Sequence, residues 1–174
     1  MLENSDGNIF GAGSIELVDL GLSVKWATTN LGADKPESIG NFYAWGELEP
    51  KTSYTVTNYK YYDSSTKKYI NIGKNISKNI NYDPAYKLDI NLCIPTETQF
   101  KELIDKCTWT KKTINNVIGY EVKGPNGKTI FIPCSGCKSE SSEITYKDHI
   151  FLMSSNSYAN TDYQFNSLRF CDNP

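Results

Sequence analysis

The sequence predicts an α+β fold that combines mixed short strands with one or two helices and long loops. Three observations support this class: one clear amphipathic helix near the middle of the chain, short alternating segments around it, and a long irregular stretch rich in tyrosine. The 174 residues are enough for one domain with a full core. We expect residues 1–13 to be a flexible lead-in and residues 14–174 to form that single domain.

The clearest element is a helix that begins near Glu97. Thr96 is a good N-cap, and Gln99 stands where a capping box places Glu or Gln. An apolar stripe then follows at helical spacing, formed by Phe100, Leu103, Ile104 and Cys107. So short a helix is unstable alone, and we expect its stripe to pack on a sheet that carries Trp26 and Phe131.

The first half of the chain contains two expected strands and a long loop. Residues 15–20 and 24–30 alternate in polarity, as a strand with one buried face does. The aromatic segment 42–45 is expected to belong to the core. Residues 50–90 keep no helical or strand period, so we expect an ordered loop held by its tyrosines.

The second half predicts two hairpins and two further strands. Residues 109–114 should pair with 119–123 across Asn115-Asn116, and 122–123 with 129–132 across a turn that contains Asn126-Gly127. The apolar run 149–153 is expected to be a central strand buried on both faces. Residues 163–165 and 168–170 make a last alternating strand.

Five cysteines leave at least one unpaired within the chain. Cys93 and Cys107 bracket the helix at roughly 15 Å, too far for a disulfide. Cys134 and Cys137 form a CxxC, which suits a redox dithiol, half of a zinc site completed by His149 and Cys171, or two small buried residues. The spacing favours the last alternative, so we expect no metal and no cofactor, with His149 beginning a strand.

Charge and hydropathy exclude some partners. The formal net charge of -2 gives no electrostatic argument for nucleic acid. No apolar run approaches the roughly 18 residues of a membrane span, so no membrane insertion is expected. The polar, acidic start lacks the pattern of a signal peptide. Either the protein is cytoplasmic or its leader is not part of this sequence.

Two segments carry a resemblance to a known family. They are VDLGLSVKWAT (residues 18–28) and GNFYAWGE (residues 40–47). Together they resemble the opening of the major paralogous domain family named after Fibrobacter, which is abundant on secreted lipoproteins of gut bacteria. The resemblance extends over about residues 17–170, through Ile94-Pro95-Thr96 and its helix to Met153-Ser154-Ser155, where the family usually has Trp-Ser-Ser.

The resemblance implies a C-type-lectin-like fold and an extracellular or cell-surface location. The family runs on past the position of Phe170, so the closing C-terminal strand is expected to be lost, replaced or truncated. The Glu-Pro-Asn or Gln-Pro-Asp loop of calcium-dependent sugar binding is not present in the sequence, and Gly124-Pro125-Asn126 belongs to a hairpin turn. A calcium lectin site is therefore not expected.

The C-terminal third suggests a binding surface. Residues 154–174 are rich in Ser, Asn, Tyr, Thr and Asp, an amino-acid composition typical of binding loops. It is also similar to the variable region of proteins diversified by retroelements. A polar loop followed by an edge strand explains the composition equally well. If the surface binds a protein or glycan ligand, the expected ligand-binding residues are Asn156, Tyr158, Asn160, Asp162, Tyr163, Asn166 and Arg169, with Tyr158 and Tyr163 exposed and close together.

Two other function classes compete with a non-enzymatic binding domain. A structural subunit of a surface or phage assembly could receive the closing strand from a strand-donating partner. An enzyme of the formylglycine-generating type would need two converging thiols, supplied by Cys134 with Cys137 or Cys171. Since the family does not share those cysteines, no catalytic residue is expected.

Overall fold

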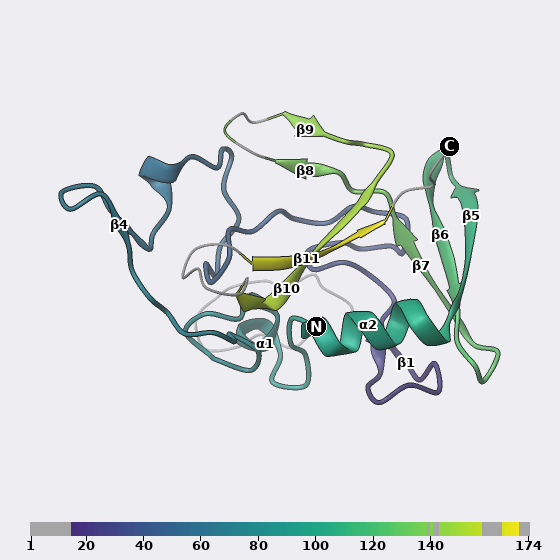
Figure 1. Ribbon diagram of the computed structural model, residues 1–174. Coiled ribbons are helices and arrows are strands. Elements are labelled where there is room, and N and C mark those ends of the chain that lie inside the picture. Colours follow the sequence, from purple (N-terminus) through teal and green to yellow (C-terminus); the bar gives the residue numbers. More distant parts are fainter. Residues whose placement is uncertain (1–14, 139, 141–142, 158–164, 171–174) are drawn as a thin grey trace, which may run out of the picture.

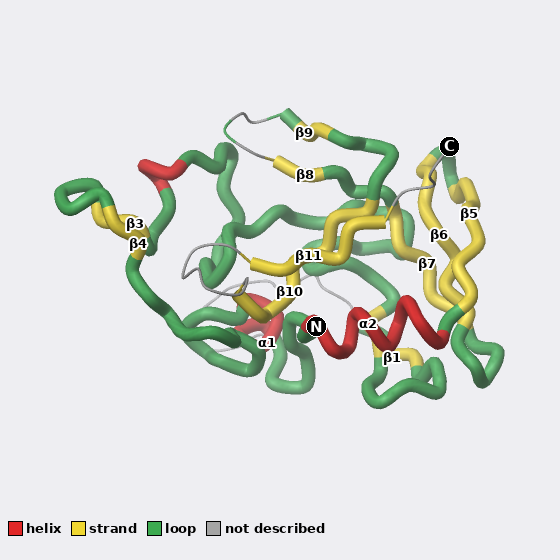
Figure 2. Tube along the Cα trace, in the orientation of Figure 1, coloured by secondary structure: helices red, strands yellow, loops and turns green. Residues whose placement is uncertain are grey.

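The computed structural model describes residues 15–138, 140, 143–157 and 165–170, which form an α+β fold of small antiparallel sheets and two α-helices (Figures 1 and 2). The helices are α1 (Pro84–Leu88) and α2 (Glu97–Lys106), with one 3-10 turn at Val56–Asn58. The strands are β1 (Leu17–Val18), β2 (Trp26–Ala27), β3 (Tyr62–Asp63), β4 (Lys68–Tyr69), β5 (Thr108–Ile114), β6 (Val117–Lys123), β7 (Thr129–Pro133), β8 (Cys137–Lys138), β9 (Ile144–Thr145), β10 (Ile150–Ser157) and β11 (Phe165–Phe170). None of the helices in this described part is both long and apolar enough to span a membrane.

The predicted hairpins are confirmed as the three-stranded sheet β5-β6-β7. Asn115 and Asn116 both have positive φ, 48° and 65°, which is the backbone that a tight two-residue hairpin turn requires. In the second turn Gly127 has φ 84° and donates its backbone N–H to the carbonyl of Gly124 at 2.9 Å. Both connections are local, and both follow directly from their turn residues.

The helix α2 begins as predicted. The Thr96 hydroxyl accepts from the backbone N–H of Gln99 at 3.3 Å, and the Gln99 side chain accepts from the backbone N–H of Thr96 at 2.8 Å. Phe100 and Leu103 are buried, but Ile104 is 43% exposed, so its predicted burial is wrong. The buried face is narrower than the apolar stripe because only one side of α2 meets the core.

The partner predicted for α2 is confirmed in part, because Phe100 and Leu103 share one buried cluster with Trp26 and with residues of the sheet that carries Phe131, but Trp26 and Phe131 do not lie in one sheet. Trp26 lies in the small β1-β2 sheet and Phe131 in the β5-β6-β7 sheet, while α2 packs against the β10-β11 ribbon. Trp26 nevertheless contacts the helix, with its ring centroid 5.8 Å from that of Phe100. The expected strands over 15–20 and 24–30 shrink to two residues each, because Gly21, with φ 77°, turns the chain soon after β1.

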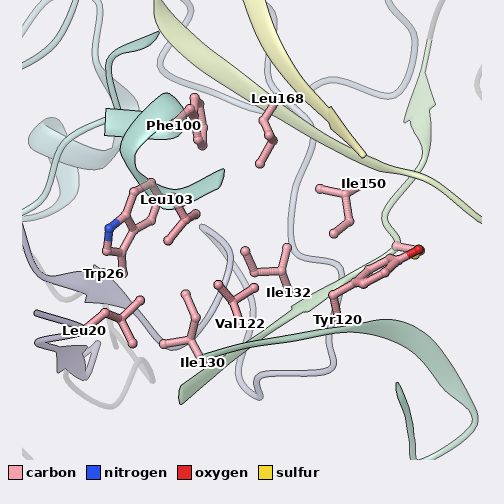
Figure 3. Close-up of a cluster of buried hydrophobic side chains, with 11 residues drawn as sticks. Leu20, Trp26, Phe100, Leu103, Tyr120, Val122, Ile130, Ile132, Ile150 and Leu168 are labelled. Carbon is pink, nitrogen blue, oxygen red and sulfur yellow. The ribbon is translucent and has the colours of Figure 1, made fainter. Parts of the chain in front are cut away.

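The main core lies where α2, the β5-β6-β7 sheet and the β10-β11 ribbon meet (Figure 3). The buried residues of this cluster are Leu20, Trp26, Phe100, Leu103, Tyr120, Val122, Ile130, Ile132, Cys134, Ile150 and Leu168. A second cluster of buried residues anchors the irregular region and contains Trp45, Tyr61, Ile72, Ile76 and Ile94. Tyr59 and Tyr82 pack against it, in line with the expectation that tyrosines order this region. Of the predicted aromatic core segment 42–45, Trp45 is buried, whereas Phe42 and Tyr43 are half-buried.

The sequence reading of residues 50–90 missed one helix. The carboxylate of Asp83 caps α1 by accepting from the backbone N–H groups of Ala85 at 3.0 Å and Tyr86 at 3.1 Å. Pro84 occupies the first turn, where no N–H is needed. The sequence feature that marks α1 is therefore the pair Asp83-Pro84, an N-cap followed by a proline in the first turn, and not a periodic pattern of apolar residues.

The expected central strand at 149–153 differs from the observed β10. This strand pairs with β11, while further along Asn75 forms a single bridge with Asn156. Ile150 is fully buried, but Phe151, Leu152 and Met153 are only half-buried, so full burial of both faces is wrong. Ile150 and Leu152 pack in the main core, whereas on the other face Met153 packs against the second cluster and Phe151 stays half-buried. The last predicted strand corresponds to β11, and its expected start at Tyr163 lies outside the described residues.

Candidate functional site

Most of the predicted ligand-binding residues lie outside the described part of the chain. These are Tyr158, Asn160, Asp162 and Tyr163, so the predicted proximity of the two tyrosines stays a prediction. Asn166 belongs to β11, although only its backbone is described. The structure describes the side chains of the two remaining residues, Asn156 and Arg169.

Asn156 connects two parts of the fold. Its side-chain oxygen accepts from the backbone N–H of Glu97 at 2.9 Å, at the first turn of α2. Its own backbone N–H donates to the hydroxyl of Ser154 at 3.1 Å. Asn156 therefore links β10 to the start of the helix and accepts from one of the first amides of α2, which have no acceptor within the helix.

Arg169 lies over two aromatic rings. Its guanidinium carbon is 5.3 Å from the ring centroid of Tyr146 and 5.2 Å from that of Phe151, both within cation–π range. His149 completes the group, with ring centroids 5.7 Å from Tyr146 and 6.1 Å from Phe151. We call these four residues the aromatic cluster.

The backbone explains how the aromatic cluster forms. Phe151 and Arg169 are directly opposite each other in the β10-β11 register. Tyr146, with φ 52°, turns the chain just before β10, and its carbonyl accepts from the backbone N–H of His149 at 2.9 Å. The sequence reading found Arg169 but missed its aromatic partners, because it treated 149–153 as buried on both faces. If 149–153 is treated as a half-buried strand paired with the last strand, Phe151 falls opposite Arg169 and can be predicted as its partner.

The aromatic cluster presents both apolar area and charge. Tyr146 is 55% exposed and Arg169 is exposed as well. The Asp148 carboxylate is 2.7 Å from Nδ1 of His149, and this hydrogen bond lowers the pKa of Asp148. Arg169 therefore places an exposed cation over two aromatic rings at this surface.

A cavity of about 880 Å³ adjoins the aromatic cluster. Residues from the first third of the chain, the segment before α2, the β7-β8 region and the outer face of the β10-β11 ribbon line it. Phe151 belongs to both features. The aromatic lining residues are Trp26, Phe42, Tyr43, Tyr54, Phe100, Phe131 and Phe151. This volume falls in the range of small-molecule sites in proteins.

The charged lining residues of the cavity share one sign. Among the lining residues that the structure describes, Lys25, Lys78 and Lys138 are the charged ones, and none is Asp or Glu. The Lys138 ammonium lies 5.2 Å from the ring centroid of Phe42, another lining residue. Phenols are neutral at pH 7, and burial raises the pKa values of the lining residues Tyr43 and Tyr54 further.

The cysteines do not converge with other metal-binding groups in the described residues. Cys134 is buried, and the half-buried Cys137 has its sulfur 3.5 Å from the Thr145 hydroxyl oxygen. No group of three His, Cys, Asp or Glu residues able to hold a metal occurs in that part of the chain. The zinc alternative that involved Cys171 lies outside the described residues. Cys93 and Cys137 both line the cavity.

Comparisons with protein-family models, curated proteins and solved structures found no match for this chain.

Proposed function

We propose that this chain is a non-enzymatic ligand-binding domain that recognises a protein or glycan through its C-terminal third. We further propose that it has the C-type-lectin-like fold of the Fibrobacter-type family, possesses no catalytic site, and works at the cell surface or outside the cell. The α+β class and the small antiparallel sheets are compatible with this fold. The observation that carries the function is Arg169, exposed above Tyr146 and Phe151 on the outer face of the ribbon.

The chemistry of this surface supports recognition of a large ligand. Tyrosine and arginine are the residue types most often found at binding hot spots, since they bring large contact area and several hydrogen bonds. The opposite face of the ribbon is anchored in the core by Ile150 and Leu168. A rigid base of this kind lowers the entropy lost when the outer side chains bind.

Binding to an array of immobilised polysaccharides and mucin glycoproteins tests this proposal. We expect the natural chain to bind some members saturably. Arg169→Ala then measures the contribution of the positive charge to binding, and Tyr146→Phe that of the phenol hydroxyl. Truncating a hot-spot arginine should weaken binding at least about tenfold. Lys112→Ala is the matched control, because Lys112 is an exposed cation paired with Glu121 on the β5-β6 hairpin. Equal binding by Arg169→Ala and the natural chain would contradict the assignment.

A structural subunit completed by a partner strand is the second candidate. Within the described residues β11 is hydrogen-bonded to β10 alone, which leaves its other edge open to strand addition. Sedimentation over a range of concentrations tests it: self-association or co-sedimentation with an extended peptide would favour assembly. A monomer that binds the array would favour ligand recognition instead.

A further inference from the structure

We propose that the cavity is a second binding site, which takes a small organic anion with an aromatic body. The inference goes beyond the surface recognition proposed above and does not depend on it. It rests on the shape of the cavity, the side chains that line it and the sign of their charges.

The apolar part of the lining suits a flat ring. Phe42, Phe131 and Phe151 contribute aromatic faces and edges, and Met153 adds a polarisable side chain that packs well on rings. The volume of about 880 Å³ is large enough to enclose a fused aromatic ring system together with some water. Such a ligand would gain affinity mainly by losing its contact with water.

The lysines of the cavity lining favour a negatively charged ligand. The whole chain has 20 acidic and 18 basic residues, so a lining with three lysines and no carboxylate among its described members departs from the overall composition. Lys138 is held against Phe42, which places an ammonium group beside an aromatic ring. A carboxylate attached to an aromatic body would pair with the ammonium while its ring packs against the lining. The neutral phenols of Tyr43 and Tyr54 leave this positive potential uncancelled.

Three probes with the same fused ring and different charge test the inference: naphthoate, naphthol and naphthylmethylammonium. Isothermal titration of the full chain should show saturable binding of naphthoate at or below about millimolar concentration. Naphthol should bind about fivefold more weakly, and the cation more weakly still. Failure of naphthoate to saturate, or equal binding of the cation, would overturn the proposal.

The cysteines report where the probe binds. Cys93 and Cys137 line the cavity, whereas Cys107 is also half-buried but lies outside the lining. Naphthoate should therefore slow the alkylation of Cys93 and Cys137 and leave the rate at Cys107 unchanged, as followed by mass spectrometry of digested protein. Equal protection of all three thiols, or of none, would show that the probe binds elsewhere.

A charge-removing pair of variants completes the test. Lys138→Met keeps much of the apolar stem and should weaken naphthoate binding about fivefold while leaving naphthol binding unchanged. Lys112→Met removes an exposed cation that is not among the lining residues and should change neither. If both variants weaken naphthoate equally, general electrostatic attraction explains the binding and the site is not supported. Lys138 lines the cavity but does not belong to the aromatic cluster, so Lys138→Met tests cavity binding separately from the surface recognition proposed above.

Discussion

The buried carboxylate of Asp83 accepts the backbone N–H of Ile94 at 3.0 Å and thereby joins the start of α1 to the segment that leads into α2. The same carboxylate accepts from the backbone N–H of Lys78 at 2.9 Å, in addition to the two amides at the start of α1. One fully buried side chain therefore organises three stretches of backbone that have no sheet in common. Backbone donors of this kind supply the hydrogen bonds without which a buried carboxyl group would be costly.

Replacing Asp83 by Ala should destabilise the fold strongly. Four backbone amides would lose their acceptor, and a buried donor without a partner is costly, so we expect a loss of about 3 kcal/mol or more in the free energy of unfolding. Urea denaturation monitored by tryptophan fluorescence measures it. Asp89→Ala is the control, because Asp89 is exposed and caps only the local Asn91 turn. A similar loss in both variants would contradict the central role of Asp83.

Leu103 and Ile104 separate the buried face of α2 from its exposed side. Leu103 is fully buried, so truncation to Ala should leave a cavity and cost about 2–5 kcal/mol. Ile104→Ala removes an equally large side chain that remains 43% exposed, and it should cost much less. Thermal and urea unfolding of the two variants should differ clearly. If their stabilities fall equally, the observed orientation of α2 is wrong.

Gly124 lies where no side chain fits. A Cβ atom added there would be 2.1 Å from the backbone oxygen of Leu20, a distance that requires the backbone to move. Gly124→Ala should therefore destabilise the contact between the β6-β7 turn and the N-terminal segment by more than about 2 kcal/mol. Gly73→Ala is the comparison, since Gly73 has φ 103° but open space around it. That variant should show only the backbone strain of about 1 kcal/mol.

Glu102 makes the stability dependent on acidity. Hydrogen bonds from Lys106 and from Ser23 lower the pKa of Glu102 from 4.5 to about 2. Because the folded pKa lies below the unfolded one, its stabilising contribution is present above about pH 4.5 and is lost as the pH falls toward 2. Glu102 is half-buried but its partner Lys106 is exposed, so the effect should be small and weakened by salt.

Glu102→Gln should flatten this part of the pH profile. The free energy of unfolding, measured by urea titration between the two pKa values, should fall less steeply for the variant than for the natural chain. Asp63, whose pKa is also lowered to about 2 by Ser65 and Thr66, supplies an independent contribution that the variant leaves in place. Parallel profiles for the two proteins would show that the contacts of Glu102 with Lys106 and Ser23 do not persist in solution.

The sequence alone determined the elements that depend on near neighbours. Thr96 and Gln99 lie within one helical turn, so their reciprocal capping needs no other part of the chain. Asn115-Asn116 sets its hairpin in the same way, through the backbone conformations that asparagine tolerates. The amphipathic stripe of α2 correctly predicted a helix and a buried face, but it could not define the width of that face.

Only the tertiary structure decided which distant residues meet. Arg169 reaches Tyr146 and Phe151 because the β10-β11 register places it opposite one ring and beside the turn that carries the other. The cavity lysines come from segments far apart in the chain, and no local pattern relates them. Such contacts depend on register and packing, which the free energy of the whole fold selects. Local propensity depends on only a few neighbouring residues, so it could predict neither the aromatic cluster nor the cavity.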